Sequence, residues 1–289
     1  MATRPAEMRR IIGQYFGLAI LLIIIVLPIG WIAGYSIAGS FGAIGMFSDG
    51  WTLRHWQAAL AVGGLKESLM LSLAVSAVTT FAAVVVTLGC VLSWPQARHR
   101  LRVLMILGVG MATPAAVAAI VVYQLLNPGG VFARIAFHLG LIDTPSEFPV
   151  LVNDVWSIGI ILAGIGCSVP LLTMTCLKIW TTAKIDRCCG LAESLGASRW
   201  QARWRIARPM LLHRIRPLIL LTFLWNLGSF EIPLLLGRQS PQMISVLIQR
   251  RAGQFDVLQR PQAFALAAIY LLLVGMGVVI MLTWRPRRV

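Results

Sequence analysis

The chain has 289 residues, of which 58% are hydrophobic and only 12% are charged, and its mean hydropathy is +0.82. A soluble domain carries about 25% charged residues, so this composition excludes an ordinary soluble protein and predicts an all-α integral membrane protein. The net charge of +15 is compatible with nucleic-acid binding, but the basic residues flank apolar runs as membrane topology requires, so no nucleic-acid partner is expected.

Basic residues and a long apolar run open the chain. Three arginines precede an apolar stretch from Ile11 to about Ile37, which is too long for a signal-peptide core and predicts a retained first membrane span. The Gly-rich outer segment that follows contains the amphipathic stretch WTLRHWQAAL, which we expect to lie along the membrane surface. Residues 1–66 are therefore interpreted as a first span with its outer segment.

Five more apolar runs predict five further spans, each at least the ~20 residues that cross the hydrocarbon layer. An Asn-Pro-Gly-Gly sequence at 127–130 ends one of these helices, and the interrupted residues 131–153 are too short to span. Pro114 and Pro170 fall inside two of the runs and predict kinks at which a bundle could open and close. The five runs cover about 68–94, 101–126, 155–179, 217–236 and 262–284.

The distribution of Lys and Arg predicts the orientation of these six spans. Eighteen of them lie on the side of both termini and of a polar segment at 186–217, and seven lie on the other side. Because cytoplasmic loops carry the excess of Lys and Arg, both termini and that segment are expected in the cytoplasm. The whole chain, 1–289, is interpreted as one transmembrane domain in which 67–284 form a five-helix core.

The segment 186–217 is the one long polar and basic stretch between apolar runs. A short helical pattern in it ends at Gly196, a residue that commonly terminates helices. Ser198 is then expected to cap a second short helix, with Gln201 as its partner in a capping box. One face of that second helix carries Trp200, Trp204 and Ala207. Two short helices set at an angle, with a tryptophan stripe and a basic rim, indicate a partner protein with a matching socket.

This segment resembles the cytoplasmic coupling loop, or EAA loop, of binding-protein-dependent permeases, the membrane subunits of type I ABC importers. The family pattern reads roughly EAAxxLGAS and then, at a fixed distance, LP; here Pro209 lies thirteen residues after Gly196, as the pattern requires. Gly190 and Leu191 stand where the family usually has Glu and Ala, and Arg208 replaces Leu before the proline. The resemblance places coupling to an ATPase on Ala192, Glu193, Leu195, Gly196, Ala197, Ser198, Trp200, Trp204 and Pro209.

The sequence contains no GxxxxGK[ST] phosphate loop, so we expect ATP hydrolysis in a separate subunit. The resemblance implies ATPase subunits that bind ATP and Mg²⁺, a second permease chain of the same or a different sequence, and an extracytoplasmic substrate-binding protein. It also implies a multi-pass protein of a bacterial inner membrane, surrounded by lipid and without a cofactor of its own. Four arginines crowd the outer loop 238–260, either as tolerated charge or as a docking surface for an acidic lobe of the binding protein.

A single acid, Glu231, lies inside the predicted fifth span. An acid at mid-span costs about 2.5–3.5 kcal/mol on insertion scales, so it is expected to face the bundle interior or water. Pro233 lacks an N–H group and Gly228 weakens the same turn, which predicts a broken helix near Glu231. The alternative is an acid near the outer helix end that is protonated or neutralised by Arg238.

The stretch SFEIPLLLG resembles the polyamine, opine, thiamine, ferric-iron and phosphonate branch of the family. This resemblance and the single acid favour a polyamine or another small cationic or zwitterionic solute. Trp225 either offers its ring to a cation or contacts lipid, and the polar end of the third span either lines the pathway or anchors the helix at the interface. The predicted pathway residues are Glu231, Asn226, Trp225, Tyr123 and Gln124.

Two other function classes remain as alternatives. A secondary transporter or channel would work without an ATPase, but such proteins usually show internal repeats or several intramembrane charges. An intramembrane enzyme would need a nucleophile with a base or a metal set, and no such catalytic or metal site is visible in the sequence. The adjacent Cys188 and Cys189 lack a second ligand pair and are interpreted as incidental thiols.

Overall fold

The computed structural model describes residues 4–44, 50–96, 100–253 and 260–283, and its regular secondary structure in these ranges is entirely helical. Five helical stretches there are long and apolar enough to cross a membrane. The predicted all-helical membrane class is therefore confirmed. The five stretches are Tyr15–Ser40, Leu65–Ser93, Ala115–His138, Ile158–Thr182 and Pro261–Val279.

The chain divides into two compact units, residues 1–63 with 248–275, and residues 64–247 with 276–289. The first unit contains α1 (Arg4–Ser40), α2 (Arg54–Leu60) and most of α13 (Arg260–Thr283). Trp56 of α2 donates its indole N–H to the hydroxyl of Ser40 at 3.2 Å, which fastens α2 to the end of α1. The ring of Phe264 on α13 meets Tyr35 of α1 edge-on, with 5.8 Å between centroids.

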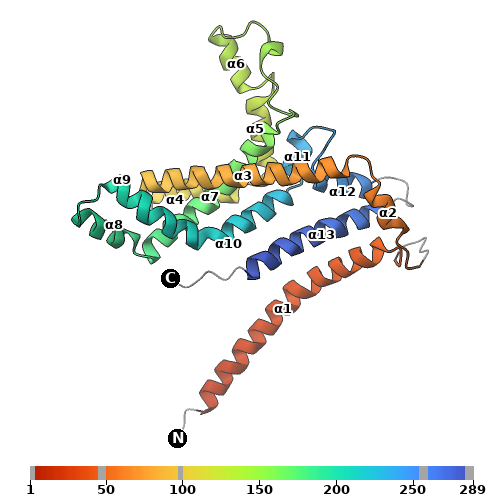
Figure 1. The fold of residues 1–289 in the computed structure, drawn as a ribbon, viewed down its shortest axis with the longest axis horizontal. Coiled ribbons are helices and arrows are strands. Elements are labelled where there is room, and N and C mark those ends of the chain that lie inside the picture. The colour runs from red at the N-terminus through yellow and green to blue at the C-terminus, as the bar shows by residue number, and fades with distance from the viewer. Residues whose placement is uncertain (1–3, 45–49, 97–99, 254–259, 284–289) are drawn as a thin grey trace. The chain divides into compact units, whose positions relative to one another are not determined.

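The second unit, which we call the core unit, is built around α3 (Leu65–Ser93), α7 (Ile158–Thr182) and α10 (Arg208–Leu227), and α3 packs extensively on α7. Gly164 permits this close approach, because a Cβ there would lie 2.6 Å from Cγ2 of Thr79. Around these helices lie the remaining elements (Figure 1): α4 (Leu101–Ala112), α5 (Ala115–Leu126), α6 (Val131–His138), the 3-10 turn Pro145–Glu147, α8 (Ile185–Ser194), α9 (Arg199–Ala202), a π-helix (Arg203–Ala207) and α11 (Glu231–Leu236). The boundary between the two units falls within α12 (Ile244–Ala252).

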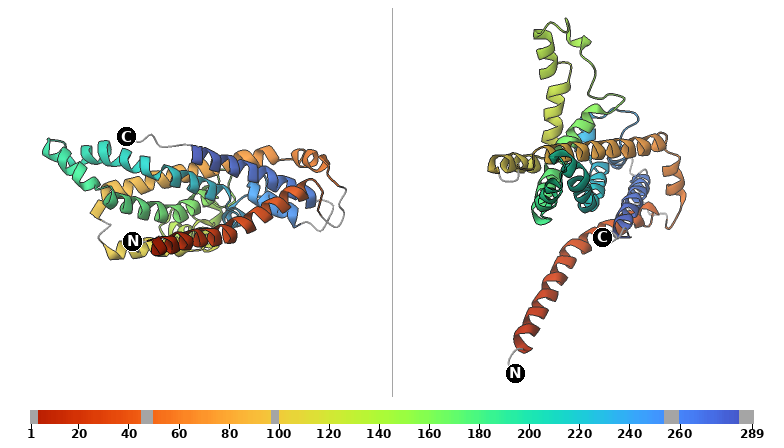
Figure 2. Two further views of the ribbon diagram at one scale, coloured as in Figure 1. Left: turned by 90° about the horizontal axis from the view of Figure 1, so that it is seen from below. Right: turned by 60° about the vertical axis from the view of Figure 1, so that its left-hand side comes forward.

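The predicted third span is not one helix. Thr113 is extended, with φ −70° and ψ 120°, and Pro114 separates α4 from α5. The physical reason is that the proline ring disfavours the helical conformation of the preceding residue and its nitrogen cannot donate to the turn before it. The structure thus replaces the expected kink with an interruption. Its predicted end is confirmed, since α5 stops at Leu126 with Asn127 as its C-cap, while α6 continues away from α3, α7 and α10 (Figure 2).

The predicted fifth span also differs. α9, the π-helix and α10 follow one another without a break from Arg199 to Leu227, so the expected second short helix is the start of a longer one. This helix stops at Leu227, and α11 begins only at Glu231, which confirms the predicted break. The apolar run 217–236 is therefore shared by two helices, and α10 does not qualify as a span by length and composition.

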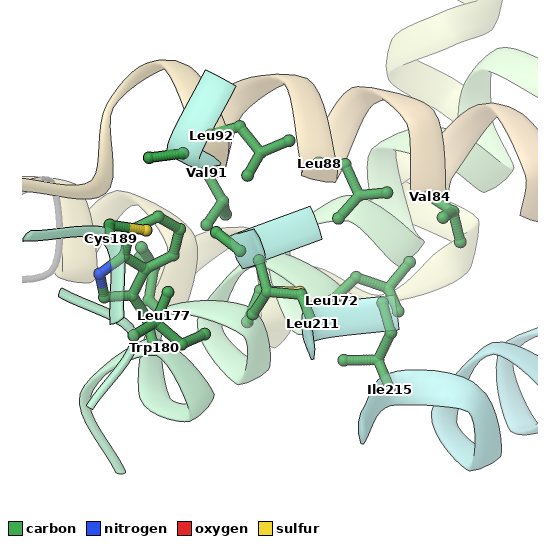
Figure 3. Close-up of a cluster of buried hydrophobic side chains, with 14 of the residues drawn as sticks. Val84, Leu88, Val91, Leu92, Leu172, Leu177, Trp180, Cys189, Leu211 and Ile215 are labelled. Carbon is green, nitrogen blue, oxygen red and sulfur yellow. The ribbon is translucent and has the colours of Figure 1, made fainter. Parts of the chain in front are cut away.

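Two buried apolar clusters hold the core unit together. One lies at the end of the bundle next to α8 and joins α3, α7, α8 and α10 (Figure 3). The other joins α3, α5, α7 and α11 further along, so that Val84 of α3 belongs to the first cluster and Val75 to the second. The largest side chains of the first cluster are Trp180, Leu92, Leu172, Ile185, Leu211 and Ile215.

Candidate functional site

Local hydrogen bonds build the turn between α8 and α9 as the sequence predicts. Gly196 is left-handed, with φ +93°, and its N–H donates to the carbonyl of Glu193 at 3.0 Å. The N–H of Ala197 donates to the carbonyl of Ala192 at 3.0 Å, which completes a Schellman motif. Ser198 and Gln201 then exchange the two hydrogen bonds of a capping box, at 3.1 and 3.2 Å. The predicted stop and the predicted cap are both confirmed.

Pro209 explains the π-helix that precedes it in the chain. Because proline has no N–H and its ring crowds the carbonyl four residues earlier, the α-helical pattern cannot continue through Arg205. The N–H of Arg208 instead donates to the carbonyl of Arg203, five residues back. The helix widens over one turn and then resumes as α10. We refer to residues 185–209 as the elbow.

The elbow exposes large apolar side chains. Leu195 is 89% exposed, Leu191 67%, Trp200 57% and Trp204 46%. The two indole rings stack with 5.5 Å between centroids and 22° between planes, and the guanidinium of Arg208 lies 4.5 Å above the Trp204 ring. Exposed apolar groups of this size on a polar segment mark an interaction surface. Ala207 departs from the predicted stripe, since it is fully buried against the first cluster.

Two polar contacts fasten the elbow to α3 and α7. The guanidinium of Arg203 donates to the carbonyl oxygens of Leu92 and Ser93 at the end of α3, at 3.1 and 3.4 Å. The indole N–H of buried Trp180 on α7 donates to the carboxylate of Asp186 on α8 at 2.8 Å. The sequence-based assignment missed both contacts. Those of Arg203 join positions more than one hundred residues apart, which no local pattern reveals.

The structure also shows the contacts and exposure of the remaining predicted coupling residues. Glu193 and Arg199 form an ion pair at 3.8 Å between side chains that are 37% and 83% exposed, and such a pair contributes little to stability. Ala192 is half-buried against the first cluster, and Pro209 is exposed.

The two adjacent thiols of the elbow are free cysteines. Cys189 belongs to the first cluster, and burial raises the pKa of its thiol, with the nearby Asp186 carboxylate adding to the effect. A buried thiol of raised pKa is a poor nucleophile and a poor metal ligand. Within the described ranges no group of His, Cys, Asp and Glu is arranged to hold a metal ion.

A cavity of about 230 Å³ lies among α4, α5, α7 and α10. Trp225, 70% exposed, forms part of its wall together with Thr113, Ser168 and Thr222. Thr113 and Thr222 donate their hydroxyl protons to helix carbonyls at 2.9 and 2.8 Å, so their oxygens remain available only as acceptors. None of the lining residues is charged. The wall therefore suits a ligand that carries hydrogen-bond donors.

Asn226 lies next to Trp225 in sequence but has a different environment. It is 7% exposed, and its side-chain amide donates to Thr80 on α3 at 3.3 Å and to Ser168 on α7 at 3.4 Å. These bonds join three helices in the interval between the two apolar clusters. The structure therefore places Asn226 at a helix junction, with one shared neighbour, Ser168, in the cavity wall.

The helix break places Glu231 at the first position of α11, where its side chain is exposed. The positive end of the helix dipole also stabilises an acidic side chain in the first turn. The carbonyl of Ser229, which Pro233 cannot pair, accepts the hydroxyl of Ser245 at 2.6 Å. Glu231 is not among the residues that line the cavity around Trp225.

Tyr123 and Gln124 lie near the end of α5 with exposed side chains. Neither lines the cavity around Trp225, and among the described residues no hydrogen bond or ion pair joins them to Glu231. The five predicted pathway residues therefore do not converge on one site within this chain.

No family model matches the chain. Over 260 residues, or 85% of its length, it is 25% identical to "Inner membrane ABC transporter permease protein YnjC" of Escherichia coli (strain K12), of which it spans about half, 46%. Its fold is similar to two bacterial ABC transporter structures. One is an alginate ABC transporter in complex with an alginate pentasaccharide-bound periplasmic protein, with a TM-score of 0.65, 18% identity and coverage of 97% of this chain and 94% of that one.

The other is an ABC transporter involved in the import of the acidic polysaccharide alginate, with a TM-score of 0.65, 17% identity and coverage of 96% and 99%. The predicted resemblance to ABC transporter permeases is confirmed in sequence by the first relative, and the two solved structures share the fold of this chain.

Proposed function

We propose that this chain, which resembles binding-protein-dependent permeases in sequence and in fold, is the membrane subunit of an ATP-driven importer in a bacterial inner membrane. In this proposal it forms a translocation pathway with a second permease chain, of the same or a different sequence. Two ATPase subunits bind ATP and Mg²⁺, and an extracytoplasmic binding protein delivers a small solute. The chain itself then carries out no chemical reaction.

The elbow is the observation that carries the proposal. Its glycine stop, capping box and proline have the spacing of a permease coupling loop, and its tryptophans are exposed while its base is packed into the first cluster. A segment whose buried side packs into a core and whose exposed side is apolar has the form expected of a contact between two subunits. Gly190 stands where the family has Glu, so in this chain the stacked rings of Trp200 and Trp204 are the proposed contact with the ATPase.

The mechanism follows from this joint. Closure of the ATPase dimer on ATP would draw two elbows together and rotate the attached helices, which changes the face of the bundle that is open. Hydrolysis and separation of the ATPases would reverse the movement. The interruptions at Pro114 and between α10 and α11 are positions where such rotation can be absorbed.

The cavity around Trp225 supports a solute that donates hydrogen bonds. Its acceptor oxygens and indole ring suit an ammonium or hydroxyl group, and a cation over an indole gains about 0.5–2 kcal/mol. This favours a polyamine or another small cationic or zwitterionic solute, as the sequence predicts. Glu231 would act outside this cavity, at the break itself. Uptake of radiolabelled putrescine, compared with that of a neutral disaccharide, tests this class directly.

Co-purification tests the proposed function. The affinity-tagged chain is expressed together with a candidate ABC ATPase subunit, and the amount of ATPase recovered is measured for the wild type and for Trp200→Ala with Trp204→Ala. We expect the wild type to retain the ATPase and the double variant to lose most of it. Trp156→Ala is the matched control, since Trp156 is 80% exposed and lies outside the elbow.

Recovery of the wild-type chain without any ATPase would count against the importer and favour the alternative, a secondary transporter or channel. Equal recovery with the double variant and the wild type would instead show that the tryptophans are not the contact.

A further inference from the structure

Arg203 differs from the other arginines of the elbow in where its guanidinium lies. It is half-buried and reaches the carbonyls of Leu92 and Ser93, whereas Arg205 is exposed and the side chain of Arg199 is 83% exposed. The carbonyls at the end of a helix have no N–H partner within it and carry the negative end of its dipole. Arg203 therefore donates hydrogen bonds to carbonyl groups in the last turn of α3, and its positive charge lies at the negative end of the helix dipole.

The two halves of the elbow are attached to different helices of the core unit. Asp186 attaches α8 to α7 through the indole of Trp180, at 2.8 Å. Arg203 attaches the π-helix to the end of α3. Apolar packing of Ile185 and Ala207 in the first cluster reinforces both attachments. A force on the elbow is thus delivered to α7 at one point and to α3 at another.

Arg203 also begins the π-helix, the widened turn that Pro209 imposes. Single π turns of this kind occur often at functional positions, because they change the direction of one side chain while the helix continues. Here the stacked tryptophans on the same helical stretch are exposed, while the arginine between them reaches the end of α3. One turn of helix thus carries both an exposed surface for a partner protein and a side chain that binds the end of α3.

We infer that Arg203 is a positioning residue that transmits movement of the elbow to α3. The inference rests on the proposed function, since the movement is supplied by the ATPase. Docking and transmission are then separate functions of the elbow: the tryptophans bind the ATPase, and Arg203 transfers the displacement to α3. Removing the guanidinium then leaves the complex assembled while α3 no longer responds to nucleotide.

The test uses the complete complex of permease and ATPase subunits in nanodiscs, with ADP and vanadate as the trapping probe. Hydrogen exchange is measured for the peptide that covers the last two turns of α3, with and without the probe. Arg203→Met retains the length of the side chain without its donors, Arg203→Lys retains a charged donor, and Arg205→Met is the matched control at an exposed arginine.

We expect the wild type and Arg205→Met to show the same nucleotide-dependent change in protection. In Arg203→Met this change falls about fivefold or more, the lower end of ordinary coupling between sites, while ATPase recovery and ATP hydrolysis persist. Arg203→Lys restores part of it. An unchanged response in Arg203→Met overturns the inference, and so does loss of the ATPase from that variant, which would make the residue part of the docking surface or of the fold. Failure of the wild type to bind an ATPase overturns the proposed function instead.

Discussion

Replacing two glycines of the elbow by alanine should have opposite effects on its local stability. Gly196 is left-handed, with φ +93°, and a Cβ in this conformation costs about 1–2 kcal/mol. Gly190 lies inside α8 with ordinary helical geometry, and a Cβ there meets nothing within 4 Å. Alanine at a mid-helix glycine stabilises by about 0.5–1 kcal/mol, because the unfolded chain loses freedom.

Hydrogen exchange of the peptide around the Schellman motif measures this difference. Opening of the turn breaks the bonds that the N–H groups of Gly196 and Ala197 donate at 3.0 Å. One to two kcal/mol corresponds to a factor of about 5–30 in the opening equilibrium, so Gly196→Ala should lose protection by that factor. Gly190→Ala should gain about two- to fivefold by the same conversion. The chain in detergent micelles is sufficient for this measurement.

A Gly196→Ala variant with wild-type protection would refute the reasoning, since it would show that the turn does not need a left-handed residue. Loss of protection in both variants would also contradict it, because the expected signs differ. Circular dichroism on both proteins serves as the control that the remainder of the helical structure persists.

Two further predictions concern the helix packing of the core unit, and thermal unfolding in detergent measures both. Gly164→Ala should destabilise by about 1–3 kcal/mol, because its methyl group would lie 2.6 Å from a side-chain carbon of α3. Gly166→Ala on the open face should not destabilise the protein. Equal unfolding midpoints for the two variants would contradict the close approach. Asn226→Ala should destabilise by about 1 kcal/mol, since two interhelical hydrogen bonds in a membrane are each worth about 0.6 kcal/mol; an unchanged midpoint with altered solute selection would instead indicate a pathway residue.

The features that could be predicted from the sequence are those whose cause is local. The stop at Gly196 and the cap at Ser198 depend on backbone groups within five residues, so the pattern of residues is sufficient to place them. The break before Glu231 follows in the same way from Pro233 and Gly228. The resemblance of residues 186–217 to a coupling loop rests on the same kind of local spacing.

Continuity of the helices was harder to predict, because proline has several outcomes. Pro114 interrupts a helix, Pro170 lies inside α7, and Pro209 widens a turn to a π-helix that then continues. In each case the ring removes one hydrogen bond, and the surrounding contacts decide which geometry replaces it.

The sequence alone determined the membrane class, the basic elbow and the positions of its stop and cap, because composition and short-range hydrogen bonding carry that information. Only the tertiary structure decided that Asn226 joins three helices while Trp225 faces a cavity, and that Arg203 reaches the end of α3. Such partners come from distant parts of the chain, and side chains adjacent on a helix point about 100° apart, so which neighbour each one meets depends on how the helices pack.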